Sequence, residues 1–115
     1  MSAKYLAPDV GDRQFLDNNA IARQRFNHKE TVNGTSDWIV IPPGPDEFTV
    51  SVDPSAGTAR VEYTQDTIQE AEAGTATSQP WPDGDVSTYA DGVMANSVTA
   101  VRCVSTADTN FRVTM

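Results

Sequence analysis

The sequence predicts an all-β protein, a small antiparallel β-sandwich or jelly-roll of six to eight strands with an extended N-terminal arm. From residue 31 onward, short runs of Val, Ile, Thr, Tyr and Phe are separated by clusters of Pro, Gly, Asp and Ser, which is typical of short strands joined by turns. Long helical patterns do not alternate with these runs. The first 30 residues follow neither pattern, and they are therefore predicted to form an arm.

The chain divides into an arm at residues 1–30 and a β-sandwich body at residues 31–115, because 115 residues have room for one hydrophobic core. Irregularly spaced apolar residues in the arm favour a segment laid over a surface, with one short helix capped by Asp17 as its regular element. The arm holds five basic and four acidic residues, whereas the body holds three basic and twelve acidic residues. The excess negative charge therefore belongs to the body.

The first strands of the body are predicted at residues 38–41, 48–53 and 59–64. The run at 38–41 is apolar throughout and is followed by three prolines within residues 42–45, which cannot continue a strand. In the next two runs apolar and polar residues alternate, so that one face of each strand is buried. The turn residues at 54–57 predict that these two strands pair as a hairpin.

The middle of the body gives weaker signals. Residues 68–73 are compatible with a short helical turn, and residues 74–79 with a brief edge strand. Residues 80–85 contain two prolines and a glycine, which predict a loop that holds Trp81 between the prolines. Because an aromatic residue in such a loop can contact another molecule, Trp81 is predicted to be a partner-binding residue.

The end of the chain again reads as strands. Residues 97–105 alternate in a β pattern, and residues 111–115 alternate as a terminal strand. Residues 107–110, with the sequence Ala-Asp-Thr-Asn, are predicted to form the turn between them.

Composition excludes several function classes. A net charge of −8 argues against binding to free nucleic acid, since phosphate backbones are bound by clustered Lys and Arg. Cys103 is the single cysteine, so no intrachain disulfide or multi-cysteine metal site can form, and a small buried residue is expected there. No apolar run approaches a signal peptide or the length that spans a bilayer, so we expect synthesis in the cytoplasm and no membrane partner.

No catalytic residue, cofactor or metal ligand is predicted. His28 is the single histidine and lies in the arm, where a solvated or interface role is expected. The acidic residues occur singly, without the aromatic cluster of a sugar-cleaving site. The segment Asp83-Gly84-Asp85 resembles the start of a calcium loop, but Thr88 and Met94 stand where that loop needs Gly and Glu, which leaves an acidic turn or a weak cation site.

Three features together resemble the capsid decoration or cement proteins of tailed bacteriophages. They are the alternating runs within residues 48–64, the Trp81 loop, and the segment Ser97-Val98-Thr99-Ala100-Val101-Arg102 followed by a short closing strand. The resemblance covers about residues 36–115 and consists of short motifs. It implies a β-sandwich or jelly-roll body, often trimeric, that sits on the outside of the particle at joints between capsomers, with an arm that crosses neighbouring shell proteins.

The resemblance implies a structural virion protein, not an enzyme, whose partners are the major capsid protein and other copies of itself, with a trimer favoured. Aromatic and arginine residues dominate interface energetics, so the predicted partner-binding residues are Tyr5, Phe15, Arg23, Arg25, Phe26 and Trp81. One alternative is a carbohydrate-binding or fibre module that attaches to a host surface through Trp81 and Tyr89. Another is a small hydrolase that uses carboxylates.

Overall fold

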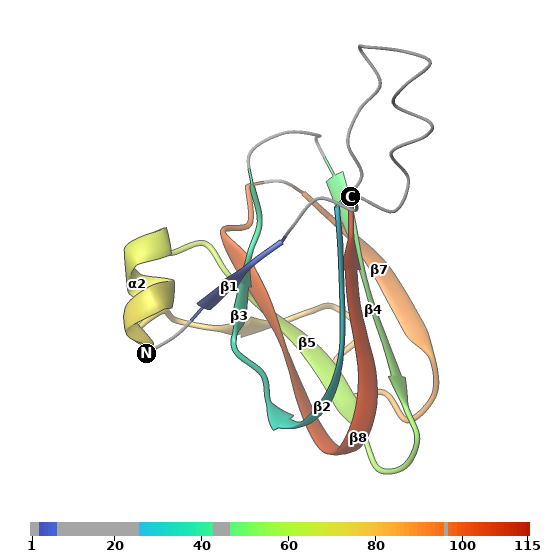
Figure 1. Ribbon diagram of the computed structural model, residues 1–115. Coiled ribbons are helices and arrows are strands. Elements are labelled where there is room, and N and C mark those ends of the chain that lie inside the picture. The colour runs from blue at the N-terminus through green and yellow to red at the C-terminus, as the bar shows by residue number, and fades with distance from the viewer. Residues whose placement is uncertain (1–2, 7–25, 43–46, 96) are drawn as a thin grey trace, which may run out of the picture.

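The computed structural model describes residues 3–6, 26–42, 47–95 and 97–115. In this part of the chain an eight-stranded sheet folds over on itself, and one short helix covers part of it (Figure 1). The all-β, sandwich-like body is therefore confirmed. The elements in chain order are β1 (Ala3–Tyr5), β2 (Asn27–Thr35), β3 (Trp38–Val40), β4 (Glu47–Pro54), β5 (Ala59–Thr64), α2 (Ile68–Ala73), β6 (Gln79–Pro80), β7 (Ala90–Ala95) and β8 (Ala100–Thr114).

The long strand β8 is the element on which the others assemble. Along one edge it pairs with β3 at residues 100–101 and with β2 at residues 104–114. Along the other edge it pairs with β5 at residues 100–105 and with β4 at residues 109–114. Figure 1 shows that β8 curves sharply between these two stretches, so that its halves run in opposite directions.

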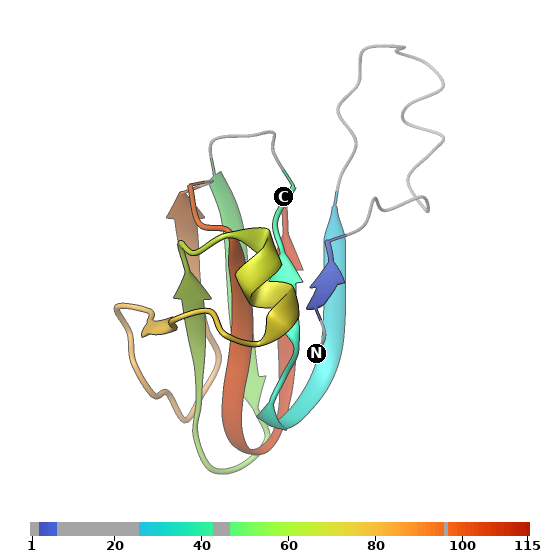
Figure 2. The same cartoon turned by 90° about the vertical axis from the view of Figure 1, so that its left-hand side faces the viewer.

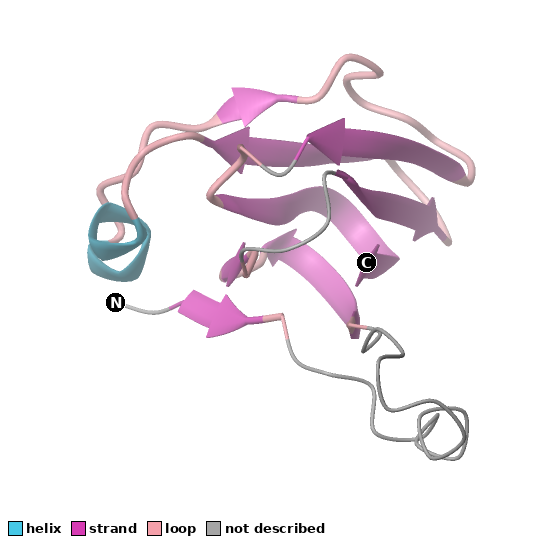
Figure 3. Cartoon of the chain, turned by 90° about the horizontal axis from the view of Figure 1, so that it is seen from above, coloured by secondary structure: helices cyan, strands magenta, loops and turns pink. Residues whose placement is uncertain are grey.

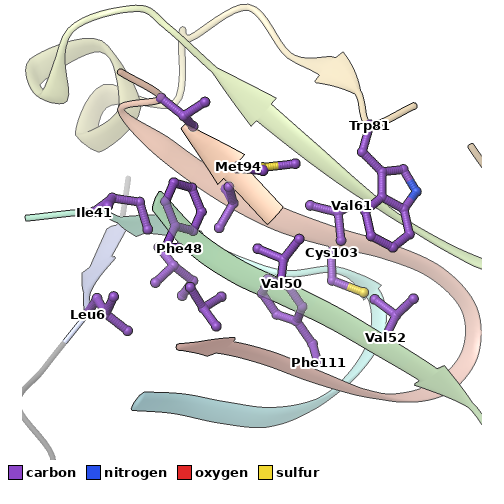
Figure 4. Close-up of a cluster of buried hydrophobic side chains, with 14 of the residues drawn as sticks. Leu6, Ile41, Phe48, Val50, Val52, Val61, Trp81, Met94, Cys103 and Phe111 are labelled. Carbon is purple, nitrogen blue, oxygen red and sulfur yellow. The ribbon is translucent and has the colours of Figure 1, made fainter. Parts of the chain in front are cut away.

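The bend in β8 produces two layers (Figure 3). One layer has the order β7-β4-β8-β2 and uses the second half of β8. The other has the order β6-β5-β8-β3-β1 and uses the first half, with β1 parallel to β3. Both halves of β8 send alternate residues into the core between the layers, which the close-up in Figure 4 shows with side chains of β4 and β5. These buried residues of β8 are Val101, Cys103, Phe111 and Val113.

The predicted turn at residues 107–110 is wrong, because these residues belong to β8. The chain does change direction nearby, but its backbone remains hydrogen-bonded to the loop between β4 and β5. Thr106 N–H donates to the Thr58 carbonyl at 2.9 Å, and Ser55 N–H donates to the Asp108 carbonyl at 3.0 Å. These hydrogen bonds hold the bend of β8 against the β4–β5 loop, and β8 remains one continuous strand through its bend.

The predicted hairpin between residues 48–53 and 59–64 is also wrong in its pairing. These residues do form strands β4 and β5, joined by a tight connection, but each strand pairs with β8 and they are not paired with each other. Alternation of polar and apolar residues is the same for either pairing. The alternation therefore found the strands and their faces without finding their partner.

The remaining elements show which local signals were sufficient. The helix α2 is confirmed: Thr67 and Glu70 form a capping box at its start, and Gly74, with φ of 80°, ends it. The brief edge strand expected at residues 74–79 is reduced to β6. The strand expected from residue 97 begins at Ala100, and β7 was not predicted.

Both described parts of the predicted arm belong to the sheet. Residues 3–5 form β1, and the boundary at residue 30 falls inside β2. The helix expected after Asp17 covers residues 18–26. Residues 18–25 lie outside the described part of the chain, and its last residue, Phe26, forms a β-bridge. That residues 7–25 form a separate arm remains a prediction.

Gly57 provides a test of the joint bend. Its φ of 64° is in the left-handed region, and a Cβ there would collide with the Thr106 hydroxyl, which accepts a 2.8 Å hydrogen bond from Thr58 N–H. Gly57→Ala is therefore expected to lower the free energy of unfolding by about 1–3 kcal/mol more than the backbone penalty alone. Chemical denaturation measures the loss.

Gly84→Ala is the matched control. Gly84 has a similar φ of 61°, but a Cβ there would meet nothing within 4 Å, so this variant should lose about 1–2 kcal/mol from the backbone conformation only. Equal losses in the two variants would contradict the close packing of the β4–β5 loop against β8.

Candidate interaction surface

Residues 7–25 of the predicted arm are flanked on both sides by residues that contact the body. At one end Leu6 is buried, and its N–H donates to the Val40 carbonyl at 3.0 Å. At the other end the Phe26 carbonyl accepts a 3.0 Å hydrogen bond from Met115 N–H, and the Phe26 ring packs against the same core as Leu6. The chain between them therefore leaves and returns to one compact base.

Two of the predicted anchor residues lie on this base. Tyr5 is 54% exposed, and its hydroxyl donates a hydrogen bond to Glu72 on α2. Phe26 is half-buried at the edge of the core. The other three predicted anchors of the arm, Phe15, Arg23 and Arg25, lie outside the described residues.

A groove of about 260 Å³ lies between β1 and β2, and it is lined mainly by polar groups. Lys4 crosses it to Glu30, with Nζ and a carboxylate oxygen 3.6 Å apart, and His28 lies 2.5 Å from the other oxygen of that carboxylate. Such a lining offers hydrogen bonds to a polar or peptide group. The lining residues are Lys4, Glu30, Thr31, Val32, Asn33, Thr35, Ser36 and Asp37.

The expectation of an exposed Trp81 is corrected, because its side chain is only 3% exposed. The indole Nε1–H donates to the Gly84 carbonyl at 2.6 Å, and the ring packs beside Gly92 of β7, where an added Cβ would stand at an ordinary contact distance of 3.6 Å. Figure 4 shows Trp81 pointing into the core beside Val61. The two prolines gave no signal for this orientation, because the ring packs in a core formed by strands that are distant in the sequence.

A charged network covers the outer face of β5 and β8. The Glu62 carboxylate is nearly buried and lies between two guanidinium groups, 2.7 Å from Arg60 and 2.8 Å from Arg102. Arg60 also reaches Asp85 at 3.3 Å, and Arg102 lies over the Trp38 ring, 4.5 Å from its centroid. Beside this network, Ala71 of α2 and Trp38 belong to one small buried cluster, and Figure 2 shows α2 lying against this layer of the sheet.

Electrostatics holds Glu62 in its ionised form. Burial alone would raise the pKa of this carboxyl, but hydrogen bonds from Arg102 and Arg60 outweigh burial and lower the pKa below its usual range. The hydrogen bond that Arg60 donates to Glu62 also raises the pKa of Arg60. This arrangement joins strands and does not present a proton donor, so its role is structural. No local pattern in the sequence indicated this network, because Glu62 and Arg102 are 40 positions apart.

The other candidates for chemistry are placed as follows. Cys103 is buried in β8, and burial raises the pKa of its thiol to about 12. Asp85 of the acidic turn pairs with Arg60. Among the described residues, no cluster of three or more His, Cys, Asp and Glu is placed to hold a metal ion, and no helix there is long and apolar enough to cross a membrane.

Searches of protein-family models, of curated proteins and of solved structures found no match to this chain.

Glu62→Gln tests the network. Removing the carboxylate leaves both guanidinium groups without their anion, and hydrogen bonds to charged groups contribute about 1.5–3 kcal/mol, so a loss of about 2 kcal/mol of unfolding free energy is expected. Asp85→Asn is the control, since this exposed pair should contribute less than about 1 kcal/mol. Denaturant titrations of both variants measure the difference.

The stability difference between wild type and Glu62→Gln is expected to depend on pH. Because the folded-state pKa of Glu62 is lowered, its contribution is complete above the unfolded pKa of about 4.3 and is lost as pH falls through the folded pKa. The stability difference between wild type and Glu62→Gln should therefore shrink below about pH 4.3. A difference that stays constant down to pH ~2, below the usual carboxyl range, would contradict an ionised Glu62.

Proposed function

We propose that this protein is a structural virion protein that decorates the outside of a bacteriophage capsid and stabilises joints between capsomers. The observation that carries the proposal is that residues 7–25 of the predicted arm are flanked by Leu6 and Phe26, which pack against the same core. A segment held in this way is presented to a neighbouring protein with less loss of conformational freedom than a free tail. The partner in this proposal is the major capsid protein.

The composition of the segment between Leu6 and Phe26 supports a binding role. It contains Phe15, Arg23 and Arg25, residue types that dominate the energetics of protein interfaces. Tyr5 and Phe26 flank it on the body. The acidic charge of the body keeps a crowded particle surface soluble. The segment therefore binds the shell, and the sandwich covers the joint.

Internal contacts of the body are consistent with stabilisation by binding alone. The carboxylate of Glu62 is held between two arginines, and Cys103 has a raised pKa, which makes it a poor nucleophile. His28 is engaged by Glu30. These described groups serve the fold, as expected for a protein that works through its surface.

The carbohydrate-binding alternative loses one of its two aromatic residues. It required Trp81 and Tyr89 as a contact face, and the Trp81 ring is buried. Tyr89 remains exposed, with its hydroxyl donating to Asp91 at 3.1 Å. A single exposed tyrosine is a weaker platform for a sugar than a pair of aromatic rings.

A particle-binding assay tests the proposal. Capsid shells of the phage or prophage that encodes the chain are assembled without it, mixed with purified protein and sedimented. A triple variant, Phe15→Ala, Arg23→Ala and Arg25→Ala, should fold as wild type but lose at least about tenfold in affinity, since such anchors each cost more than 1 kcal/mol when truncated. Deleting residues 1–30 would remove β1 and part of β2, so point substitutions are the cleaner test.

Gln65→Ala with Gln69→Ala, on exposed positions beside and within α2, is the control and should bind as wild type. Full binding by the triple variant would overturn the role of the arm. Absence of binding by wild type would overturn the decoration proposal. Binding to a glycan array that is lost in Tyr89→Ala would favour the carbohydrate alternative instead.

A further inference from the structure

We propose that copies of this protein associate head to tail by pairing β7 of one copy with β2 of the next, so that one layer of the sandwich continues from copy to copy. The proposal concerns the protein by itself, and it goes beyond attachment to a capsid. It rests on strand edges, charges and backbone direction in the layer β7-β4-β8-β2.

β7 and β2 are the two end strands of this layer. Within the described residues, β7 is paired with β4 alone and β2 is paired with β8 alone. Each strand therefore has a second edge that no described strand covers. Such an edge carries backbone N–H and C=O groups in position to pair with another strand.

β7 lacks the features that usually protect an edge strand. It contains no Lys, Arg or Pro, and its pairing with β4 runs in register from Ala90 to Ala95 without a bulge. Val93 on its outer face is 63% exposed, and Tyr89, which directly precedes the strand, is 59% exposed. Apolar side chains of this kind gain most from being covered.

The backbone groups of β2 that face away from β8 can be assigned from one hydrogen bond. Met115 N–H donates to the Phe26 carbonyl, so Phe26, and by alternation His28, turn their backbone groups toward β8. The backbone groups of Asn27, Lys29 and Thr31 therefore point away from β8. The irregularity after Val32 ends this regular edge.

The same alternation continues across the layer. If residue 115 faces β2, then Thr114 faces β4 and forms a hydrogen-bonded pair with Thr49. The neighbouring residue Phe48 then faces β7, where its partner is Met94. The backbone groups of Asp91 and Val93 consequently point outward, away from β4.

Strand direction allows the two edges to meet. β2 and β4 both run antiparallel to β8, and β7 runs antiparallel to β4. Continuing the layer from one copy to the next therefore brings β7 against β2 in antiparallel orientation, with outward backbone groups facing each other. Odd-numbered residues lie on the outer face of both strands, so this pairing also preserves the two faces of the sheet.

Charge complementarity favours head-to-tail pairing of β7 with β2 over pairing of two identical edges, such as β2 with β2. One row across the outer face reads Asp91, Ser51, Arg112, Lys29, with the acid at the β7 end and the bases at the β2 end. Pairing two β2 edges would bring the Lys29 side chains near each other, whereas β7 against β2 places Asp91 opposite Lys29. Head-to-tail contacts of this kind make closed rings or filaments.

The register that pairs Asp91 with Lys29 also matches side-chain size on the inner face. The small residues Gly92 and Ala90 then stand opposite the larger His28 and Glu30 of the next copy. Met94 meets Phe26, which lies half-buried at the edge of the core. On the outer face Val93 is covered by Asn27, and Tyr89 lies opposite Thr31.

Sedimentation velocity of the full-length protein over a range of concentrations tests the proposal. Wild type should self-associate. Asp91→Lys and Lys29→Asp should each raise the dissociation constant at least about tenfold, since like charges placed opposite each other at an interface cost several kcal/mol. Combining the two substitutions should return the constant to within about threefold of wild type, because the pair is restored with its charges exchanged.

Two further variants separate this contact from general charge and from misfolding. Asp83→Lys makes the same charge change in an exposed loop and should leave association unchanged. Val93→Pro removes an outward N–H without removing a hydrogen bond to β4, so it should abolish association while the circular dichroism spectrum stays that of wild type.

A wild-type protein that is monomeric at every concentration overturns the proposal, and so does a double charge exchange that fails to restore association. If Val93→Pro does not fold, the double variant Asp91→Lys with Lys29→Asp decides the test, because it changes exposed side chains only. Because no capsid shell is present, these outcomes are independent of the particle-binding assay.

Discussion

The pairing of β8 with four other strands is the constraint on which this structure depends. β8, near the C-terminus, pairs with β2 and β3 along one edge and with β4 and β5 along the other. Its bend divides one sheet into two layers, and alternate side chains from both halves fill the space between them. The core, the loop contacts of Gly57 and the fixed base of residues 7–25 all follow from this strand.

This arrangement leaves clear roles for the faces and edges of the sheet. On the outer face of one layer, α2 packs beside the charged network of Glu62, which binds β5 to β8. The other layer ends in β7 and β2, whose outer edges no described strand covers. The proposed contact between copies uses these two edges, and the proposed contact with a shell protein uses the segment between Leu6 and Phe26.

Sequence alternation was sufficient to find β4 and β5, and the residues of α2 were compatible with a short helical turn, because these elements depend on local residue patterns. It did not find strand partners: the β4–β5 connection looked like a hairpin, and residues 107–110 looked like a turn. Both errors arose because long-range pairing with β8 decided the outcome. The orientation of Trp81 was missed for a similar reason, since its ring packs into a core formed by strands that are distant in the sequence.

Native-state hydrogen exchange along β8 tests the central claim most directly. If β8 is one strand that holds both layers, the paired amides of its two halves should exchange with the same free energy, close to that of global unfolding. The amides between residues 105 and 109 that pair with β2 and the β4–β5 loop should also be protected. Rapid exchange at residues 105–109, together with separate opening of the two halves, would contradict the account and support two strands joined by a turn.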